Sequence, residues 1–316
     1  MSGQVSMSTG TKTKLVELRG ELVRRILTLV QSAADFPTAV AGLTLFRRTS
    51  PTPCHHVAYE PSLSVFVQGR KVINLGGERY VCDGSSFLLS SIDVPVQSQI
   101  IEASERAPLL SMHFRLDMTA VRELMSREEL PEIETLHQRV GLAVGTSSVG
   151  LLSACLRMVE LLDTPEDIPF LSPLIAREII YRILRSPQGE RLRAIATTGD
   201  LSQRTARAIT WLRTNFTKPL RMEELASEAR MGVSTLHHQF RALTAMSPLQ
   251  FQKQLRLQSA RQRMLLDGID ATSAAYEVGY ESTSQFTREY SRMFGQPPMR
   301  DIKALRDAKV GAIDAA

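Results

Sequence analysis

The sequence has little of what export, disulfide scaffolds and common catalytic motifs require. Of its 316 residues only three are cysteines (Cys54, Cys82 and Cys155), and their odd number and spacing match neither a disulfide framework nor a zinc site. It contains no Gly-rich phosphate loop and no Gly-x-Ser-x-Gly elbow. A polar Ser/Thr/Gly start and an early apolar run interrupted by Arg24 and Arg25 favour neither a signal peptide nor a membrane span. We therefore expect a reduced, cytoplasmic protein without a cofactor.

The last third of the sequence contains two related helix-turn-helix patterns. They match at four pairs of positions, each with an offset of 50 residues by subtraction: Leu236 and Phe286, Phe240 and Tyr290, Ala245 and Gly295, Pro248 and Pro298. In the first copy Met231-Gly232-Val233 is the expected turn and Ser234 the expected N-cap of the second helix; in the second copy these roles fall to Gly279-Tyr280 and Ser282. Each second helix would bury one face and leave the other exposed.

An amphipathic run begins at Pro248 and ends at Gly268, between the two copies. A helix of roughly 18 residues is about 27 Å long. Adjacent major-groove faces of DNA lie about 34 Å apart. A strut of this length could place two reading helices in successive grooves.

Residues from about 204 to 306 resemble the DNA-binding domain of the AraC/XylS family of bacterial transcription regulators. The resemblance is carried by "STLHHQFRALTAMSPLQFQKQLRLQSARQRML" and, in the second copy, by "AAYEVGYESTSQFTREYSRMFGQPP". The sequence departs from the family pattern at Ala245, where glycine is usual, and at Ala275 and Tyr276. From residue 200 onward there are 17 Lys and Arg against 12 Asp and Glu, and before it 21 against 21, so the net charge of +5 lies in this part. This excess favours attraction to phosphate.

The expected DNA contacts are side chains that point away from the buried positions of the two reading helices. They are Ser234, Thr235, His237, His238 and Arg241 in the first copy, and Thr283, Ser284, Gln285 and Arg288 in the second. Arg288 could pair with guanine and Gln285 with adenine. The basic residues Arg241, Lys253, Arg256, Arg261 and Arg292 are expected to contact the DNA backbone or to remain surface charges.

The first part of the sequence predicts a β domain with flanking helices. Helical spacing covers about 14 to 34, and short β-rich runs with glycine turns cover about 43 to 116, which indicates a small antiparallel sandwich or barrel. "YEPSLSVFVQGRKVINLGGERYVCDGSSFLLSSIDVPV" resembles the cupin-like effector domain of one branch of the same family, which implies a small ligand inside or at the mouth of the barrel. Two helices between 149 and 186 could form a dimer interface or cover the β domain.

Three alternative chemistries involve residues of the β domain. "PCHHV" differs at one residue from an alkyltransferase active-site motif, which makes Cys54 a candidate nucleophile, and Cys54 or Cys82 could instead sense a thiol-reactive signal. A cupin metal site could use only His55, His56, Glu60 and His113, and adjacent histidines on a strand point to opposite faces. The weak candidates for effector contacts are Cys54, His56, Cys82 and His113.

We therefore expect an α+β protein with two folded domains. The expected parts are a disordered tail over 1–13, a cupin-like effector and dimerisation domain over 14–194, a linker over 195–203, a double helix-turn-helix domain over 204–306 and a tail over 307–316. The expected function is sequence-specific transcription regulation by a homodimer that binds operator DNA, RNA polymerase and a small effector. Neither enzymatic activity nor a bound metal is expected.

Overall fold

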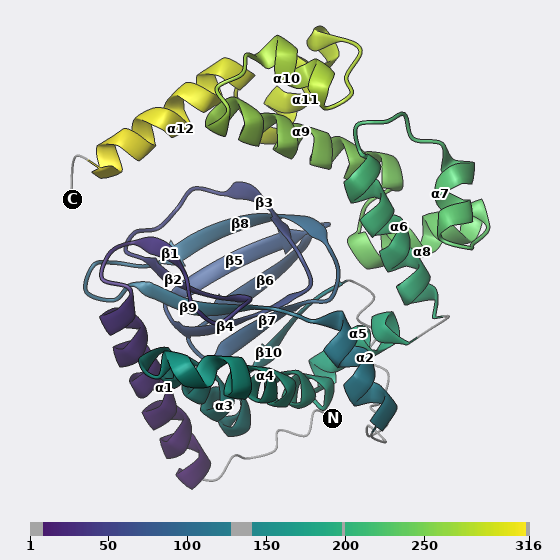
Figure 1. Ribbon diagram of the computed structural model, residues 1–316. Helices are drawn as coiled ribbons and strands as arrows, with labels where there is room; N and C mark the ends of the chain where they lie inside the picture. The colour runs from purple at the N-terminus through teal and green to yellow at the C-terminus, as the bar shows by residue number, and fades with distance from the viewer. Residues whose placement is uncertain (1–8, 128–140, 198–199, 314–316) are drawn as a thin grey trace. The chain divides into compact units, whose positions relative to one another are not determined.

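The computed structural model describes residues 9–127, 141–197 and 200–313. The chain divides into two compact units, with the main division between Gln203 and Arg204. The N-terminal unit contains two antiparallel sheets with helices, and the C-terminal unit is helical throughout its described part (Figure 1). The expected α+β class is therefore confirmed.

Two sheets build the β part of the N-terminal unit. The strands are β1 (Ala34–Pro37), β2 (Leu43–Arg48), β3 (His55–Tyr59), β4 (Ser62–Gln68), β5 (Arg70–Leu75), β6 (Glu78–Asp83), β7 (Ser86–Ser90), β8 (Val94–Glu102), β9 (Leu109–Arg115) and β10 (Leu142–Thr146). The larger sheet has the order β1-β2-β9-β4-β7-β10, and the smaller has the order β3-β8-β5-β6. In the larger sheet β9 pairs antiparallel with both β2 and β4, which brings Thr44 and Ser64 beside His113.

Helices cover one face of the larger sheet. They are α1 (Thr9–Leu29), α2 (Met118–Arg127), α3 (Val149–Glu160), α4 (Ile168–Leu184) and α5 (Glu190–Ala196), with short 3-10 turns at Leu161–Asp163, Pro165–Asp167 and Pro187–Gly189. Leu22 and Ile26 of α1 are fully buried in one cluster with Leu110 and Met112 of β9. Because neighbouring residues of a strand point to opposite faces, His113 faces the other sheet.

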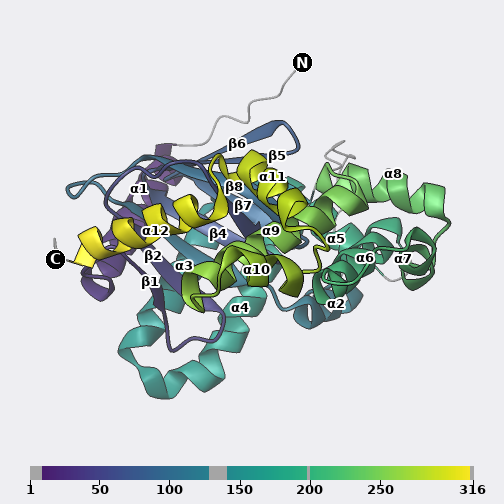
Figure 2. The same cartoon turned by 90° about the horizontal axis from the view of Figure 1, so that it is seen from above.

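Seven helices make up the described part of the C-terminal unit. They are α6 (Leu201–Asn215), α7 (Met222–Glu228), α8 (Val233–Thr244), α9 (Pro248–Leu266), α10 (Ala271–Glu277), α11 (Thr283–Phe294) and α12 (Pro298–Ile313). Helices α6, α7 and α8 gather at one end of α9, and α10, α11 and α12 gather towards the other (Figure 2). The expected strut is α9, which has 19 residues and begins with a capping box between Ser247 and Gln250. The box satisfies backbone groups at the helix start.

Several boundaries differ from the sequence prediction. Helix α1 already begins at Thr9, inside the expected tail, and ends at Leu29, five residues before the expected end at about 34, and the unpredicted strand β1 follows at Ala34–Pro37. Helix α5 ends at Ala196 and α6 begins at Leu201, so both extend into the expected linker, while α12 continues to Ile313. Strand β10 follows the expected β region. Residues 1–8, 198–199 and 314–316, which complete the predicted tails and linker, lie outside the described residues.

Candidate nucleic-acid interface and ligand site

The first candidate reading helix is α8. Its N-cap is Gly232 rather than Ser234, and no side chain caps the helix. The expected capping role of Ser234 is therefore wrong, because this residue already lies in the first helical turn. Leu236 and Phe240 are fully buried, and the Phe240 ring meets Phe251 of α9 edge to face at 5.4 Å between centroids. These contacts fix α8 on α9 and leave its other side to solvent.

The predicted DNA contacts of α8 lie together on that solvent side. Ser234, Thr235, His237, His238 and Arg241 are all exposed. They include hydroxyl, imidazole and guanidinium groups, which can donate to or accept from base edges and phosphates. The arrangement is therefore chemically suited to a DNA groove.

The second candidate reading helix, α11, is capped as the sequence predicts. The Ser282 side chain accepts a hydrogen bond from the Gln285 backbone N–H at 3.3 Å. On the buried side Tyr290 donates to Asp301 Oδ2 at 2.7 Å. Burial and this carboxylate both raise the pKa of Tyr290, which keeps the phenol protonated as a donor. The helix is therefore held by a specific polar contact as well as by its apolar face.

The exposed side of α11 carries most of the second predicted set. Ser284, Gln285 and Arg288 are exposed, whereas Thr283 is half-buried. The Gln285 side-chain amide donates to Glu289 Oε1 at 3.2 Å, so its donor already has a partner within the helix. Arg288 lies one turn after Ser284 and occupies the position equivalent to His238, by the offset of 50 residues.

Glu289 joins three elements of the second motif. It accepts hydrogen bonds from Lys253 Nζ of α9 at 2.6 Å and from the Tyr280 hydroxyl at 2.8 Å. Burial alone would raise the pKa of Glu289, but the hydrogen bonds from Lys253, Tyr280 and Gln285 lower it below its ordinary value. Glu289 is therefore a charged residue of α11 that ties this helix to α9 and to the turn at Tyr280, and the residue pattern alone did not identify it.

Three of the five basic residues expected on the surface or at phosphates are engaged inside the C-terminal unit. Lys253 pairs with Glu289. Arg256 donates to the carbonyls of Phe216, Thr217, Lys218 and Gly279. Arg261 binds Asp301 through Nε and Nη2, each at 2.8 Å. The prediction is thus corrected for these three residues, whereas Arg241 and Arg292 are exposed as expected.

The turns of the two motifs differ in length by one residue. The N-caps of the first helices, Arg221 and Asp270, are 49 residues apart by subtraction, and those of the second helices, Gly232 and Ser282, are 50 apart. The residue with positive φ is Arg230 in the first turn, at 53°, and Gly279 in the second, at 91°. The offset of 50 found in the sequence therefore applies from the start of the second helices onward and not to the first helices.

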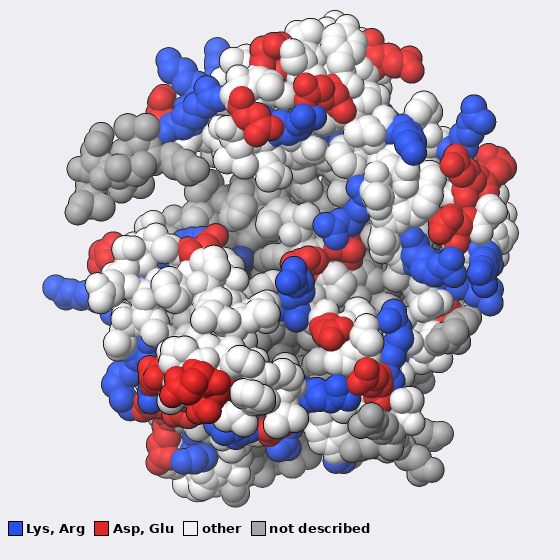
Figure 3. Space-filling model, viewed as in Figure 1, with Lys and Arg blue, Asp and Glu red and all other residues white. Residues whose placement is uncertain are grey.

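Charged side chains of both signs are scattered over the visible surface, which is otherwise uncharged (Figure 3). Figure 3 shows lysine and arginine interspersed with aspartate and glutamate rather than one uniformly basic region on this face. The excess positive charge after residue 200 thus acts as a modest overall attraction to phosphate. Base contacts from α8 and α11 would have to supply the specificity.

In the N-terminal unit, His113 is the effector candidate that faces the space between the sheets. Its Nδ1 lies 3.1 Å from the Ser64 hydroxyl, and its ring meets Phe46 edge to face. Burial, together with Lys71 and Arg115, lowers the pKa of His113 against an opposing effect of Glu60. His113 is therefore favoured in its neutral form at pH 7.

The other three effector candidates differ from His113 in their surroundings. Cys54 is exposed and precedes β3. His56 is half-buried and, by strand alternation, lies on the face of β3 opposite Tyr59. Cys82 is fully buried, and burial raises the pKa of its thiol to about 12. A neutral buried thiol is a poor nucleophile, so Cys82 has the environment of a small apolar core residue.

Two further polar residues accompany His113, and sequence reasoning did not select them. Lys71 shares a face of β5 with the buried Ile73, and its Nζ lies 5.6 Å from the centroid of the Tyr59 ring. Ser98 of β8 is fully buried, and its hydroxyl has no hydrogen-bond partner within the described part of the chain. Both residues could have been predicted from the sequence, because the alternation of inward and outward side chains along β5 and β8 places Lys71 and Ser98 on the inward faces. Among the described residues, no group of three His, Cys, Asp or Glu side chains could hold a metal ion.

These features define a class of protein: a β domain with a polar group between its sheets, followed by a double helix-turn-helix domain with two exposed second helices. The model of the N-terminus of AraC-type transcriptional regulators matches residues 39–191, and a helix-turn-helix domain model matches residues 225–303. Together the two matches span more than half of the chain. The chain belongs to the AraC family of transcriptional regulators.

Curated relatives share about a quarter of their residues with the chain over part of their length. The transcriptional regulator ExsA of Pseudomonas aeruginosa is 27% identical over 172 residues, which are 54% of this chain and 61% of ExsA. The transcriptional activator RhaS of Yersinia pestis is 27% identical over 153 residues, which are 48% of this chain and 53% of RhaS. The match thus spans little more than half the length of these relatives.

Solved structures of ToxT from Vibrio cholerae share the fold. Ligand-free ToxT superposes with a TM-score of 0.52 at 12% identity, over 85% of this chain and 98% of ToxT. ToxT bound to an unsaturated fatty acid superposes with a TM-score of 0.51 at 13% identity, over 83% of this chain and 93% of ToxT. At this identity the likeness concerns the architecture alone. No helix in the described part of the chain is long and apolar enough to cross a membrane.

Proposed function

We propose that the chain is a sequence-specific DNA-binding transcription regulator that inserts α8 and α11 into successive major grooves. The observation that carries this proposal is the pair of exposed polar faces joined by α9. With 19 residues, α9 is about 28 Å long, close to the spacing of about 34 Å between adjacent major-groove faces. Both reading helices are fixed to this strut by buried aromatic side chains, so their spacing is set before DNA binds.

Base recognition is divided between the two helices. Arg288 donates to the O6 and N7 acceptors of a guanine, and Gln285 pairs with an adenine after its amide leaves Glu289. On α8 the hydroxyls of Ser234 and Thr235 and the imidazoles of His237 and His238 contact further bases. Arg241 binds phosphate, as do Thr283 and Ser284 where their hydroxyls reach the backbone.

A small molecule bound in the N-terminal unit controls this activity. The space between the sheets offers Lys71, His113 and the unpartnered Ser98 hydroxyl as polar contacts for an effector. ToxT, which shares the architecture, has been solved with an unsaturated fatty acid. An effector with different affinities for two arrangements of the chain shifts their populations and thereby the DNA sites that are occupied.

The regulator acts as a homodimer in the cytoplasm, where it recruits RNA polymerase, and it performs no catalysis. The dimer surface is the outer side of α4, where Phe170 and Leu174 are exposed by 77% and 63%. Large apolar side chains exposed next to each other are typical of protein interfaces. Leu174→Asp would shift sedimentation of the full chain towards the monomer. Val16→Asp, at another exposed apolar position of the unit, is the matched control.

DNA binding is tested by sequencing the fragments that the full chain retains from a random library at two salt concentrations. We expect a common motif whose two conserved blocks lie about one helical turn, or about 10 base pairs, apart. The motif should persist at the higher salt although total retention falls. Diffuse retention that disappears with salt and contains no motif would contradict the proposal.

A further inference from the structure

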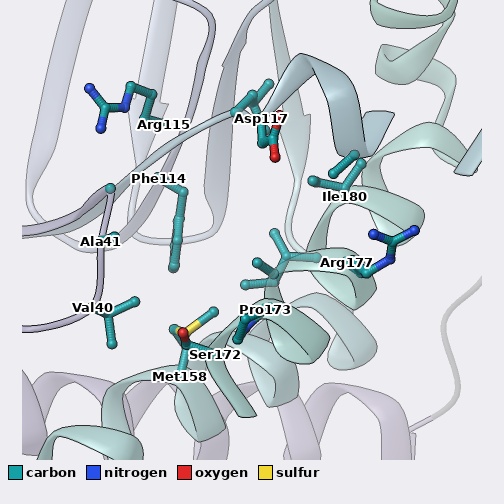
Figure 4. A pocket seen from close by; sticks show the side chains of 15 residues that line it. Val40, Ala41, Phe114, Arg115, Asp117, Met158, Ser172, Pro173, Arg177 and Ile180 are labelled. Atoms are coloured by element: carbon teal, nitrogen blue, oxygen red, sulfur yellow. The ribbon is translucent and has the colours of Figure 1, made fainter. Parts of the chain in front are cut away.

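The N-terminal unit contains a pocket on the other side of the larger sheet from His113. This pocket, called here the helix-side pocket, lies between the first half of α4 and the end of β9 and has a volume of about 280 Å³ (Figure 4). Phe114 points into it, and because Phe114 and His113 are neighbours in β9, the pocket and the space between the sheets lie on opposite faces of one strand. The pocket is therefore separate from the space between the sheets.

The wall of the helix-side pocket is apolar. Val40, Phe114 and Leu116 line it from the sheet side, and Met158, Pro173 and Ile180 line it from α3 and α4. Its volume equals that of about nine water molecules in the liquid. A site of this size and lining favours a compact apolar group, such as one aromatic ring with a short chain.

The polar groups at the rim determine what kind of head group fits. Arg177 of α4 donates through Nη2 to Glu123 at 2.8 Å, which leaves other guanidinium donors for a ligand. Asp117 Oδ1 accepts from the Thr119 backbone N–H at 2.8 Å and so caps α2. Arg115 shares its face of β9 with His113, so its guanidinium is turned away from the pocket (Figure 4). The rim thus offers the remaining donors of Arg177, whereas the carboxylate of Asp117 already accepts a hydrogen bond.

We propose that the helix-side pocket binds a compact hydrophobic carboxylate, with its apolar part against Phe114 and its carboxylate on Arg177. A bidentate contact between a guanidinium and a carboxylate has the geometry that this head group requires. The site is distinct from the effector site proposed between the sheets. It assigns a binding role to Arg177, Met158 and Ala176, which no sequence pattern selects.

Helix α4 connects this pocket to the proposed dimer surface. Pro173 lines the pocket and lies inside the helix, where it has no N–H to donate to the carbonyl four residues earlier. The turn from Ile168 to Ser172 is therefore attached by fewer hydrogen bonds than the rest of α4. This turn carries Phe170 and Leu171, which are exposed by 77% and 40%. Ligand contact with Pro173 would reposition the outer face of α4, an inference that rests on the proposed dimerisation.

Isothermal titration of the full chain with hydrocinnamate, and with its uncharged primary amide, tests the site. We expect saturable binding of hydrocinnamate and affinity for the amide lower by about tenfold or more, because a charge-assisted hydrogen bond is lost. Arg177→Gln should lower the affinity for hydrocinnamate to the affinity that the wild-type chain has for the amide. Arg182→Gln removes a guanidinium of the same helix that does not line the pocket, so it should leave both affinities unchanged.

Two further variants locate the ligand. Ala176→Phe fills the pocket and should abolish binding, whereas His113→Ala should leave it intact. The reverse pattern would place the ligand between the sheets and overturn the proposal, as would the absence of saturable binding in the wild-type chain. The same samples are tested for DNA retention, so that loss of DNA binding is scored separately. If bound hydrocinnamate left the sedimentation of a dimeric wild-type chain unchanged, the coupling through α4 would be wrong.

Discussion

In the proposed mode of DNA binding, base recognition by α11 depends most on Arg288. It is exposed, its guanidinium has no ion pair among the described residues, and its five donors suit the paired acceptors of guanine. Arg292, one turn later on the same helix, is equally exposed but lies farther from the N-terminal end that enters a groove. A comparison of variants at these two positions therefore distinguishes a base contact by Arg288 from a general effect of positive charge on DNA binding.

Arg288→Ala should lower binding to the preferred operator by about 1–3 kcal/mol and relax the preference at one base pair. The comparison is made by measuring affinities for the operator and for single-base variants. Arg292→Ala should weaken all of these sequences by the same factor. An equal loss on every sequence for Arg288→Ala would show that this residue binds phosphate instead.

The backbone conformation of the second turn requires glycine at position 279. Its φ is +91°, and an added Cβ would lie 2.0 Å from the carbonyl oxygen of Thr217. The same region receives the Arg256 guanidinium, which donates to the Gly279 carbonyl at 2.7 Å. Any side chain at this position would separate α10 from the loop that Arg256 organises.

We expect Gly279→Ala to destabilise the C-terminal unit by about 2–4 kcal/mol, from positive-φ strain and a steric clash together. Gly295→Ala is the control, because Gly295 has a φ of +80° but no atom within 4 Å of an added Cβ. Gly295→Ala should lower the free energy of unfolding by only about 1 kcal/mol, because it introduces backbone strain without a clash. Urea unfolding followed by fluorescence of Trp211, the single tryptophan, measures both. Equal costs would show that no clash occurs.

At the level of elements, the contact of α9 with α11 and α12 depends on one buried polar group. Asp301 of α12 accepts from Arg261 of α9 and from Tyr290 of α11, and its side chain is only 10% exposed. The Arg261 guanidinium also lies 4.4 Å from the centroid of the Phe294 ring. Removal of one partner leaves a buried charge without compensation.

Arg261→Met should therefore destabilise the C-terminal unit by about 2–4 kcal/mol in urea unfolding. Arg263→Met, two residues along the same helix, removes a guanidinium that is 42% exposed and pairs with Asp267 and Glu277 at the surface. That change should cost less than about 1 kcal/mol. If both variants lose the same stability, the Asp301 contact is no more than a surface pair.

Acid should weaken the second motif before it weakens the apolar cores. Hydrogen bonds from Ser273 and Thr272 lower the pKa of Asp270, the N-cap of α10, and those from Lys253, Tyr280 and Gln285 lower that of Glu289. Because both pKa values are lower in the folded chain, the stabilisation is complete above the unfolded values of 3.8 and 4.5 and is lost as pH falls below them.

Unfolding of the wild-type chain at pH 7 and at about pH 2.5, below both unfolded values, should show this loss, with a smaller pH dependence in Asp270→Asn. Asparagine retains the N-cap but cannot be protonated in this range, so it removes the titration without removing the cap. An unchanged pH dependence in Asp270→Asn would assign the effect to other carboxylates.

At the scale of the whole molecule, the positive charge after residue 200 should make DNA affinity depend on salt. The logarithm of the association constant falls linearly with the logarithm of salt concentration, by about 0.9 for each phosphate that is neutralised. Arg241→Ala should reduce this slope by about 1 and weaken all sequences alike. Fluorescence anisotropy of labelled operator and non-operator DNA measures both slopes. A loss confined to the operator would instead make Arg241 a base contact.

The sequence alone determined the two-domain class and most of the reading surface. Apolar residues at helical spacing required Leu236, Phe240, Phe286 and Tyr290 to face inward, and that requirement placed His238 and Arg288 outward. Ser282 could be assigned as an N-cap because its contact is local. The cap at Ser234 was assigned wrongly because a glycine two residues earlier can adopt the same extended backbone.

Tertiary structure decided which basic side chains remain available and which residues line the helix-side pocket. Arg256 and Arg261 have the exposed spacing of surface residues in the sequence, yet carbonyls and a carboxylate from distant segments bind them. Lys71, Ser98 and His113 come from different strands, and the helix-side pocket is lined by strand β9, the turn before β2 and three helices. Residue patterns record the local period of a helix or strand, whereas contacts between distant segments depend on strand order and helix packing, which only the folded chain defines.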